Sequence, residues 1–265
     1  MGGVKAHVVD TGEVDEAPRD TVVLIHGFVC SSWAWRANID ALAQHRRVLA
    51  PCQKGFGWTG AGHDDFSIEA LARFLLGVLD ARGVRRATFV GNSLGGAVSL
   101  WIAAHHPERV SSLVLVNSLA VRWRLPRWAF KTQVSGLAPL YRRLATPGIV
   151  RTGLQLAAYR GLMVDHDYLS GFLAPLRRER AMKVALAVAN DLHDGAARLD
   201  PLLESIQQPA LVVWGARDLI MPLRSGRILA RRLPNARLVV FDRCGHCPHE
   251  EAPRRFNALV ERFDG

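Results

Sequence analysis

Cysteine is scarce in this chain: four residues among 265 are too few for a disulfide scaffold. Two of them, Cys244 and Cys247, have C-x-x-C spacing, but no second paired cluster accompanies them as a metal site would need. Long apolar runs are also missing, so no segment has the length of a membrane span. No apolar region behind Met1-Gly2-Gly3 resembles a secretory signal. We expect a cytoplasmic protein with no cofactor, no metal and no stable membrane insertion.

Acidic residues are outnumbered, with 24 Asp and Glu against 34 Lys and Arg, for a net charge of +10. No nucleic-acid-binding motif accompanies this charge, so we expect no nucleic-acid partner. Most of the excess falls in residues 119–200, where Arg122, Arg124 and Arg127 form one basic group. Two interpretations remain open: a surface that attracts an anionic substrate, and ordinary solvated arginines.

The apolar content of 49% is sufficient for a full hydrophobic core. Short runs rich in β-branched residues alternate with helical patterns, which predicts an α/β fold with a doubly wound, mostly parallel sheet. The predicted strands are Ala6–Val9, Val22–Ile25, Arg47–Ala50, Ala87–Val90, Ser112–Val116, Ala210–Trp214 and Arg237–Phe241. The predicted helices are Trp33–Gln44, Ser67–Arg82, Gly95–His105, Arg224–Arg232 and Arg254–Phe263.

The alternation breaks once, between residues 119 and 200, where apolar residues recur at helical intervals without a strand. This pattern predicts a helical lid (residues 119–200) inserted into a core made of residues 1–118 and 201–265. Such a lid would roof a pocket and select its substrate. Its aromatic residues Trp123, Trp128 and Phe130, together with Trp33 in the core, are candidates for substrate contacts, although aromatic residues more often pack a lid onto its core.

The strongest motif is Gly91-Asn92-Ser93-Leu94-Gly95, which lies where a predicted strand ends and a predicted helix begins. A serine stands exposed at such a sharp turn only if its neighbours lack bulk, so the motif indicates a nucleophile elbow. Three further segments that such a site needs occur in the expected order along the chain. His26-Gly27-Phe28 comes directly after an early strand, Asp218 follows the penultimate strand, and His246 follows the last.

With these motifs, the chain resembles the α/β-hydrolase family over nearly its whole length. The acidic residue and proline that follow the histidine in this family correspond to Glu251 and Pro253. One departure lies in the segment Pro51-Cys52-Gln53-Lys54-Gly55, where Cys52 replaces an aspartate that usually orders a loop. The replacement affects the expected shape of the pocket wall more than the reaction.

The resemblance and the chemistry imply the same roles. Ser93 would attack a carbonyl carbon, His246 would take and return its proton, and Asp218 would orient the imidazole. The backbone N–H groups of Phe28 and Leu94 would form the oxyanion hole.

Two other positions could compete with Asp218 for the role of the acid, and neither is favoured. Some relatives carry the acid after the strand that follows the elbow helix, but here Ser112–Val116 ends in Asn117, which cannot be an anion. Glu251 is expected to cap the final helix, because acidic side chains stabilise first turns.

A serine nucleophile argues against relatives that use an aspartate there, such as haloalkane dehalogenases and epoxide hydrolases. We therefore expect a hydrolase of carboxylic esters, lactones or thioesters of a hydrophobic small molecule. Carbon–carbon bond hydrolysis of meta-cleavage products stays open, because Gly91–Gly96 and the Cys-Gly-His tail resemble that group. A perhydrolase and a triad-retaining small-molecule receptor are further alternatives. The sequence predicts neither the natural substrate nor the oligomeric state.

Overall fold

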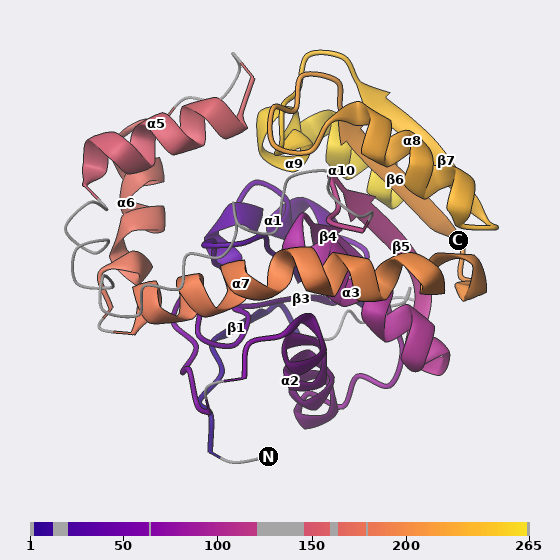
Figure 1. Cartoon of the computed structure of the whole chain (residues 1–265), viewed down its shortest axis with the longest axis horizontal. Coiled ribbons are helices and arrows are strands. Elements are labelled where there is room, and N and C mark those ends of the chain that lie inside the picture. Colours follow the sequence, from indigo (N-terminus) through magenta and orange to yellow (C-terminus); the bar gives the residue numbers. More distant parts are fainter. Residues whose placement is uncertain are drawn as a thin grey trace.

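A single seven-stranded sheet organises the chain in the computed structural model, which describes residues 3–12, 21–63, 65–120, 146–159, 164–178 and 180–263 (Figure 1). The strand order is β1-β3-β2-β4-β5-β6-β7, and every neighbouring pair is parallel except β1 with β3. The strands are β1 (Val8–Asp10), β2 (Val22–Ile25), β3 (Val48–Pro51), β4 (Ala87–Asn92), β5 (Val110–Val116), β6 (Ala210–Gly215) and β7 (Ala236–Phe241). The predicted doubly wound, mostly parallel sheet is confirmed.

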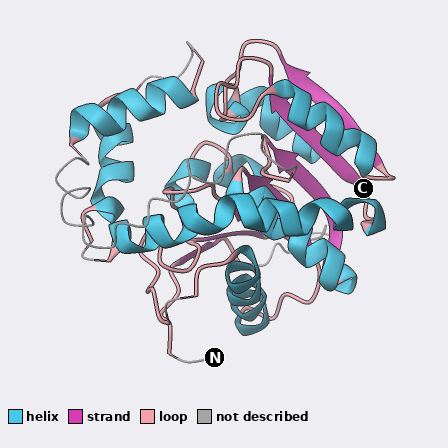
Figure 2. Cartoon of the chain, in the orientation of Figure 1, coloured by secondary structure: helices cyan, strands magenta, loops and turns pink. Residues whose placement is uncertain are grey.

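Helices lie on both sides of this sheet and at one end of it (Figure 2). The α-helices are α1 (Ile39–Leu42), α2 (Ile68–Ala81), α3 (Leu94–His105), α5 (Pro147–Ala157), α6 (His166–Leu176), α7 (Ala181–Leu199), α8 (Leu223–Arg232), α9 (Pro248–Glu251) and α10 (Pro253–Glu261). Three short 3-10 helices are η1 (Ser32–Trp35), η2 (Pro107–Arg109) and η5 (Asp200–Ser205).

Two hydrophobic clusters cover the two faces of the sheet, because alternate strand residues point in opposite directions. On one face, Phe89 and Val212 pack among the apolar residues of α2, α3 and α8. On the other face, Val90 and Val213 pack with α1 and α10. The central strands are buried on both faces, so their sequences are continuous apolar runs rather than alternating ones.

The predicted helix Trp33–Gln44 is wrong as a continuous element. The chain forms η1, continues as a turn over residues 36–38, and resumes as the short α1. The break lets the buried Asn38 reach the C-terminal helices: its amide nitrogen donates to the carbonyl oxygen of His249 at 3.0 Å and to Oδ1 of Asn257 at 2.7 Å. This long-range pairing outweighs local helix propensity.

Between β5 and β6 the chain contributes α5, α6 and α7, and the described residues of this stretch contain no strand. Figure 1 shows α7 passing across α3, whereas α5 and α6 lie to one side of the sheet. Residues 121–145, the first part of the predicted lid, lie outside the described residues. The insertion is therefore helical where it is described, and its function as a lid stays a prediction.

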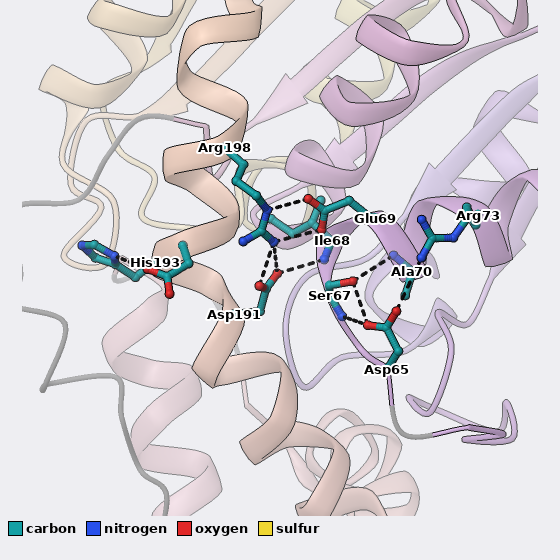
Figure 3. Close-up of polar contacts among 10 residues, drawn as sticks. Asp65, Ser67, Ile68, Glu69, Ala70, Arg73, Asp191, His193 and Arg198 are labelled. Atoms are coloured by element: carbon teal, nitrogen blue, oxygen red, sulfur yellow. Dashed lines mark hydrogen bonds and ion pairs between the residues drawn. The ribbon is translucent and has the colours of Figure 1, made fainter.

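A polar cluster fastens the long helix α7 to the start of α2 (Figure 3). Arg198 on α7 contacts both oxygens of Glu69, at 2.6 and 2.9 Å, and both oxygens of Asp191 on its own helix. Asp191 Oδ2 also accepts the backbone N–H of Ile68 at 3.0 Å. Asp191 thus supplies a cap for α2 from another element, in addition to the capping hydroxyl of Ser67.

Replacing Asp191 should cost more stability than replacing its arginine partner. We expect Asp191→Ala to lower the free energy of unfolding by about 1–2 kcal/mol, because a helix N–H loses its acceptor. Arg198→Ala should cost less than about 1 kcal/mol, since the arginine side chain is 45% exposed and partly exposed ion pairs contribute little to stability. Urea denaturation would measure both; a larger loss in Arg198→Ala would contradict the capping role.

Candidate active site

Ser93 lies at a sharp turn between β4 and α3. Its backbone is left-handed, with φ 52° and ψ −114°, which a residue with a side chain rarely adopts. A Cβ on Gly91 would lie 2.5 Å from the backbone carbon of Gly95, and one on Gly95 would lie 2.1 Å from the carbonyl oxygen of Ile25. The Ser93 N–H donates to the carbonyl oxygen of Val116 at 2.9 Å. The motif therefore folds as a strand-to-helix turn with Ser93 at its tip.

Asp218 and His246 meet on the loops that follow β6 and β7. Nδ1 of His246 lies 2.7 Å from Oδ2 of Asp218. The other carboxylate oxygen, Oδ1, accepts the backbone N–H groups of Ile220 at 2.7 Å and Met221 at 2.9 Å. The Asp218 side chain is fully buried, and that of His246 is 9% exposed. With Nδ1 donating to a carboxylate, the neutral imidazole presents Nε2 as a proton acceptor.

Glu251 holds the loop around His246. Its carboxylate accepts the backbone N–H groups on both sides of the histidine, from Gly245 at 2.9 Å and from Cys247 at 3.1 Å. The prediction that Glu251 caps the final helix is wrong, since no side chain caps α10. The carboxylate accepts these two N–H groups instead of those of the helix, because the histidine loop folds back over it.

The inserted helices also contact this loop. The backbone N–H of His246 donates to the carbonyl oxygen of Ala157, the last residue of α5, at 2.7 Å. The Tyr159 N–H donates to Glu251 at 2.6 Å. The position of His246 therefore depends on the insertion as well as on the core.

The loop after β2 lies directly against the elbow. A Cβ on Gly27 would approach Oδ1 of Asn92 to 2.9 Å and Cβ of Ser93 to 3.4 Å, so a larger residue there would displace the Asn92 amide. The next residue, Phe28, packs edge-on against Phe56 with ring centroids 6.0 Å apart. Leu94, the first residue of α3, follows Ser93 directly, and Phe28 follows the glycine that lies against Ser93.

His26 shapes that loop from inside the protein. Its Nε2 accepts the backbone N–H of Gln53 at 2.9 Å, so Nδ1 carries the proton and donates to the carbonyl oxygen of Gly27 at 2.8 Å. The Gln53 amide donates to the carbonyl oxygen of His26 at 2.6 Å. Complete burial disfavours the charged ring and lowers the pKa of His26 to about 4.

Cys52 is buried at the end of β3 and takes part in the same region. Its Sγ lies 3.4 Å from the backbone N of Ser32 and 3.5 Å from Nδ1 of His7. A Cβ on the neighbouring Gly57 would reach Sγ at 2.4 Å. The thiol thus fills a tight space where weak contacts replace the strong hydrogen bonds that an aspartate would form.

The other candidate substrate contacts fall into two groups. Trp33 is 38% exposed, and its ring packs against α6, where a Cβ on Gly171 would clash with it at 2.1 Å. Trp123, Trp128 and Phe130 lie outside the described residues, as do Arg122, Arg124 and Arg127.

All four cysteines are free thiols. In the part of the chain that the structure describes, no three histidine, cysteine, aspartate or glutamate side chains converge as metal ligands. Across the same residues, no helix is long and apolar enough to cross a membrane.

The carboxyl edge of the sheet thus carries the Asp218–His246 contact and the Ser93 turn with Gly27 packed against it, and Asn92, next to Ser93, donates to the carbonyl oxygen of His246 at 3.1 Å. Such a set can transfer a proton from a hydroxyl to an imidazole and stabilise the charge that forms on it. Sequence reasoning missed the supporting roles of His26 and the amide of Asn117, which donates to Asp218 at 2.5 Å. The sequence signal available for both residues was that each directly follows a predicted strand.

Stability should fall in mild acid because His26 must stay neutral. Its pKa is about 4 in the folded protein against a reference value of 6.5, so the unfolded chain binds the proton first as pH falls. This contribution is complete above pH 6.5 and is lost between pH 6.5 and 4, by up to about 3 kcal/mol. The free energy of unfolding of His26→Gln, measured in urea, should depend less steeply on pH over that range than that of wild type. The same pH dependence in variant and wild type would refute this cause.

Comparison with known proteins assigns the chain to one protein family. Residues 22–259 match the model described as "Alpha/beta hydrolase family". The chain is 31% identical to a 2-hydroxy-6-oxo-2,4-heptadienoate hydrolase of Pseudomonas putida, over 99% of this chain and 93% of that protein.

Solved structures agree with this match. One is a variant of the meta-cleavage product hydrolase CumD, with a TM-score of 0.82 and 27% identity over 98% of this chain and 94% of that one. Another is the enol-lactonase of Burkholderia xenovorans LB400, with a TM-score of 0.77 and 25% identity over 98% and 96%. The chain is a hydrolase that belongs to the alpha/beta hydrolase family and is related to the meta-cleavage product hydrolases.

Proposed function

We propose that this protein is a serine hydrolase that cleaves a carboxylic ester, lactone or thioester of a hydrophobic small molecule. The observation that carries the proposal is the 2.7 Å contact between His246 Nδ1 and Asp218 Oδ2, at the sheet edge where the elbow presents Ser93. A hydroxyl becomes a competent nucleophile at neutral pH when a positioned base removes its proton. The three residues supply the nucleophile, the base and the group that orients the base.

The reaction would run in two halves. Ser93 Oγ attacks the carbonyl carbon while His246 takes its proton, and the imidazolium then protonates the departing alcohol or thiol. Water attacks the resulting acyl-enzyme with His246 again as base, which releases the acid and restores Ser93. The N–H groups of Phe28 and Leu94 would bind the oxyanion, each contributing on the order of 2.7–4 kcal/mol to lowering the barrier. Leu94 begins α3, so the helix dipole adds to its effect.

The helices of the insertion would serve as the lid. They reach the site directly, through the contacts of Ala157 and Tyr159 with the loop that carries His246. The side chains that join insertion and core beside it are apolar and aromatic, with Tyr168 and Phe172 of α6 packed against Ala34. We expect a substrate with a hydrophobic acyl or alcohol group, because small-molecule sites are lined mainly by apolar and aromatic side chains.

Replacement of the nucleophile gives the direct test. Purified wild type should hydrolyse short to medium-chain p-nitrophenyl esters, and Ser93→Ala should lose activity by roughly four to six orders of magnitude in kcat. A fluorophosphonate should label wild type at one site and leave Ser93→Ala unlabelled. Asp191→Ala serves as the control, because its replacement weakens the fold away from the site. Full ester turnover by Ser93→Ala would refute the proposal.

Carbon–carbon bond hydrolysis is a second candidate, favoured by the 31% identity with the heptadienoate hydrolase. Such a reaction would use the same serine on a ketone carbonyl, with carbon as the leaving group. The bulky Phe28 and Val29 oppose it, since the meta-cleavage enzymes are expected to carry a glycine-rich loop there. Val29 packs against the core with a left-handed φ of 58°.

The two candidates predict different substrate preferences. We expect kcat/KM for the best p-nitrophenyl ester to exceed that for 2-hydroxy-6-oxo-2,4-heptadienoate by on the order of a hundredfold or more, about 3 kcal/mol in transition-state binding. Loss of dienoate absorbance measures the second reaction with the same enzyme sample. The reverse order would assign carbon–carbon hydrolysis, with Ser93→Ala inactive on both substrates. Inactivity on both by wild type would leave neither reaction standing.

A further inference from the structure

Asn117 is a buried amide at the junction of the loops that carry the acid and the base. It follows β5 and has a left-handed backbone, with φ 43°. Its Nδ2 donates to Asp218 Oδ2 at 2.5 Å and lies 3.3 Å from the carbonyl oxygen of Gly245, while its Oδ1 accepts the N–H of Gly215 at 3.2 Å. One side chain thus contacts the end of β6, the acid and the residue before His246.

The oxygen that Asn117 contacts is the one that faces the imidazole. Oδ2 of Asp218 lies 2.5 Å from the amide and 2.7 Å from His246 Nδ1, whereas Oδ1 is occupied by two backbone N–H groups. A donor to Oδ2 spreads its negative charge and reduces its attraction for a proton on the imidazole. It also fixes the plane of the carboxylate, since both oxygens are then held.

Only an uncharged group that donates and accepts satisfies all these contacts. A carboxylate at this position would lie against Asp218 and repel it, and an apolar side chain would leave the Gly215 N–H buried without its acceptor. Asparagine also tolerates the left-handed backbone better than most residues do. The residue type, its backbone and its hydrogen bonds are therefore mutually consistent.

We propose that Asn117 is a positioning residue that sets the orientation and the proton affinity of the Asp218–His246 pair. This inference rests on the proposed function, because it takes His246 as the base. Without the amide, the less stabilised carboxylate holds the imidazolium more tightly. The protonated, inactive form of the base then persists to higher pH.

The test uses Asn117→Gly, because glycine accepts the left-handed backbone without strain and removes the whole amide. We expect the midpoint of the acid limb of kcat/KM for a p-nitrophenyl ester to rise by roughly 0.5–1 pH unit. We expect kcat to fall on the order of 10- to 100-fold, with KM changed less than about twofold, because the base is misplaced and the substrate contacts remain.

A matched control separates positioning from loss of stability. Thr88→Val removes another buried polar pair of the sheet, the 3.0 Å contact between Thr88 and Ser112, and should lower stability without moving the midpoint. If Asn117→Gly fails to unfold cooperatively, Asn117→Ser replaces it, since the shorter hydroxyl does not restore the contact with Oδ2. A midpoint equal to that of wild type, with loss of activity in proportion to loss of stability, would overturn the inference.

A second readout does not depend on turnover. NMR titration of the His246 imidazole in the unliganded protein, assigned with His246→Ala, should show the same upward shift in Asn117→Gly. Identical titrations in variant and wild type would overturn the role of Asn117 even if esters are hydrolysed. Absence of ester turnover in wild type would instead refute the proposed function, while a shifted titration would still support the effect of the amide on the pair.

Discussion

Backbone contact between the loops after β6 and β7 is the constraint on which the site depends. A Cβ on Gly215 would lie 1.9 Å from the carbonyl oxygen of Gly245, so no side chain fits between the two loops. That approach brings Asp218 within hydrogen-bond distance of His246. Parallel strands end at the same edge of the sheet, so the loops that follow neighbouring strands lie close together. Asp218 and His246 are therefore in direct contact although they are 28 residues apart in the sequence.

Close packing at this edge makes protein partners important for buried polar groups. Two neighbouring carboxamides supply several of them: Asn92 donates to the carbonyl oxygens of Val116 and His246, and Asn117 donates to Asp218. Because both residues end adjacent strands, their positions are as fixed as the sheet itself. The site is thus supported by rigid elements, and its geometry does not rely on the flexibility of surface loops.

The sequence was sufficient to predict the seven strands, their mostly parallel order and the loops at which the polar residues lie. Those features depend on local patterns: apolar runs, glycines at sharp turns and the order of motifs. The helix prediction at Trp33–Gln44 missed the pairing of Asn38 with His249, because no local pattern indicates a contact across 211 residues of chain. The capping role of Glu251 failed for another reason: its carboxylate accepts the N–H groups of Gly245 and Cys247, and the residue pattern does not show how that loop folds. The sequence indicated only that Asn117 cannot be the acid. The role of its amide became visible only in the structure, where it donates to Asp218.

The inserted helices change how substrate preference and catalysis relate in this chain. If the insertion only covered the pocket, its sequence would influence substrate binding alone. Here the carbonyl of Ala157 accepts the backbone N–H of His246, and Glu251 joins Tyr159 to the same loop. A movement of the end of α5 would therefore displace His246, the proposed base. Substitutions in the insertion that alter substrate choice would for that reason alter kcat as well.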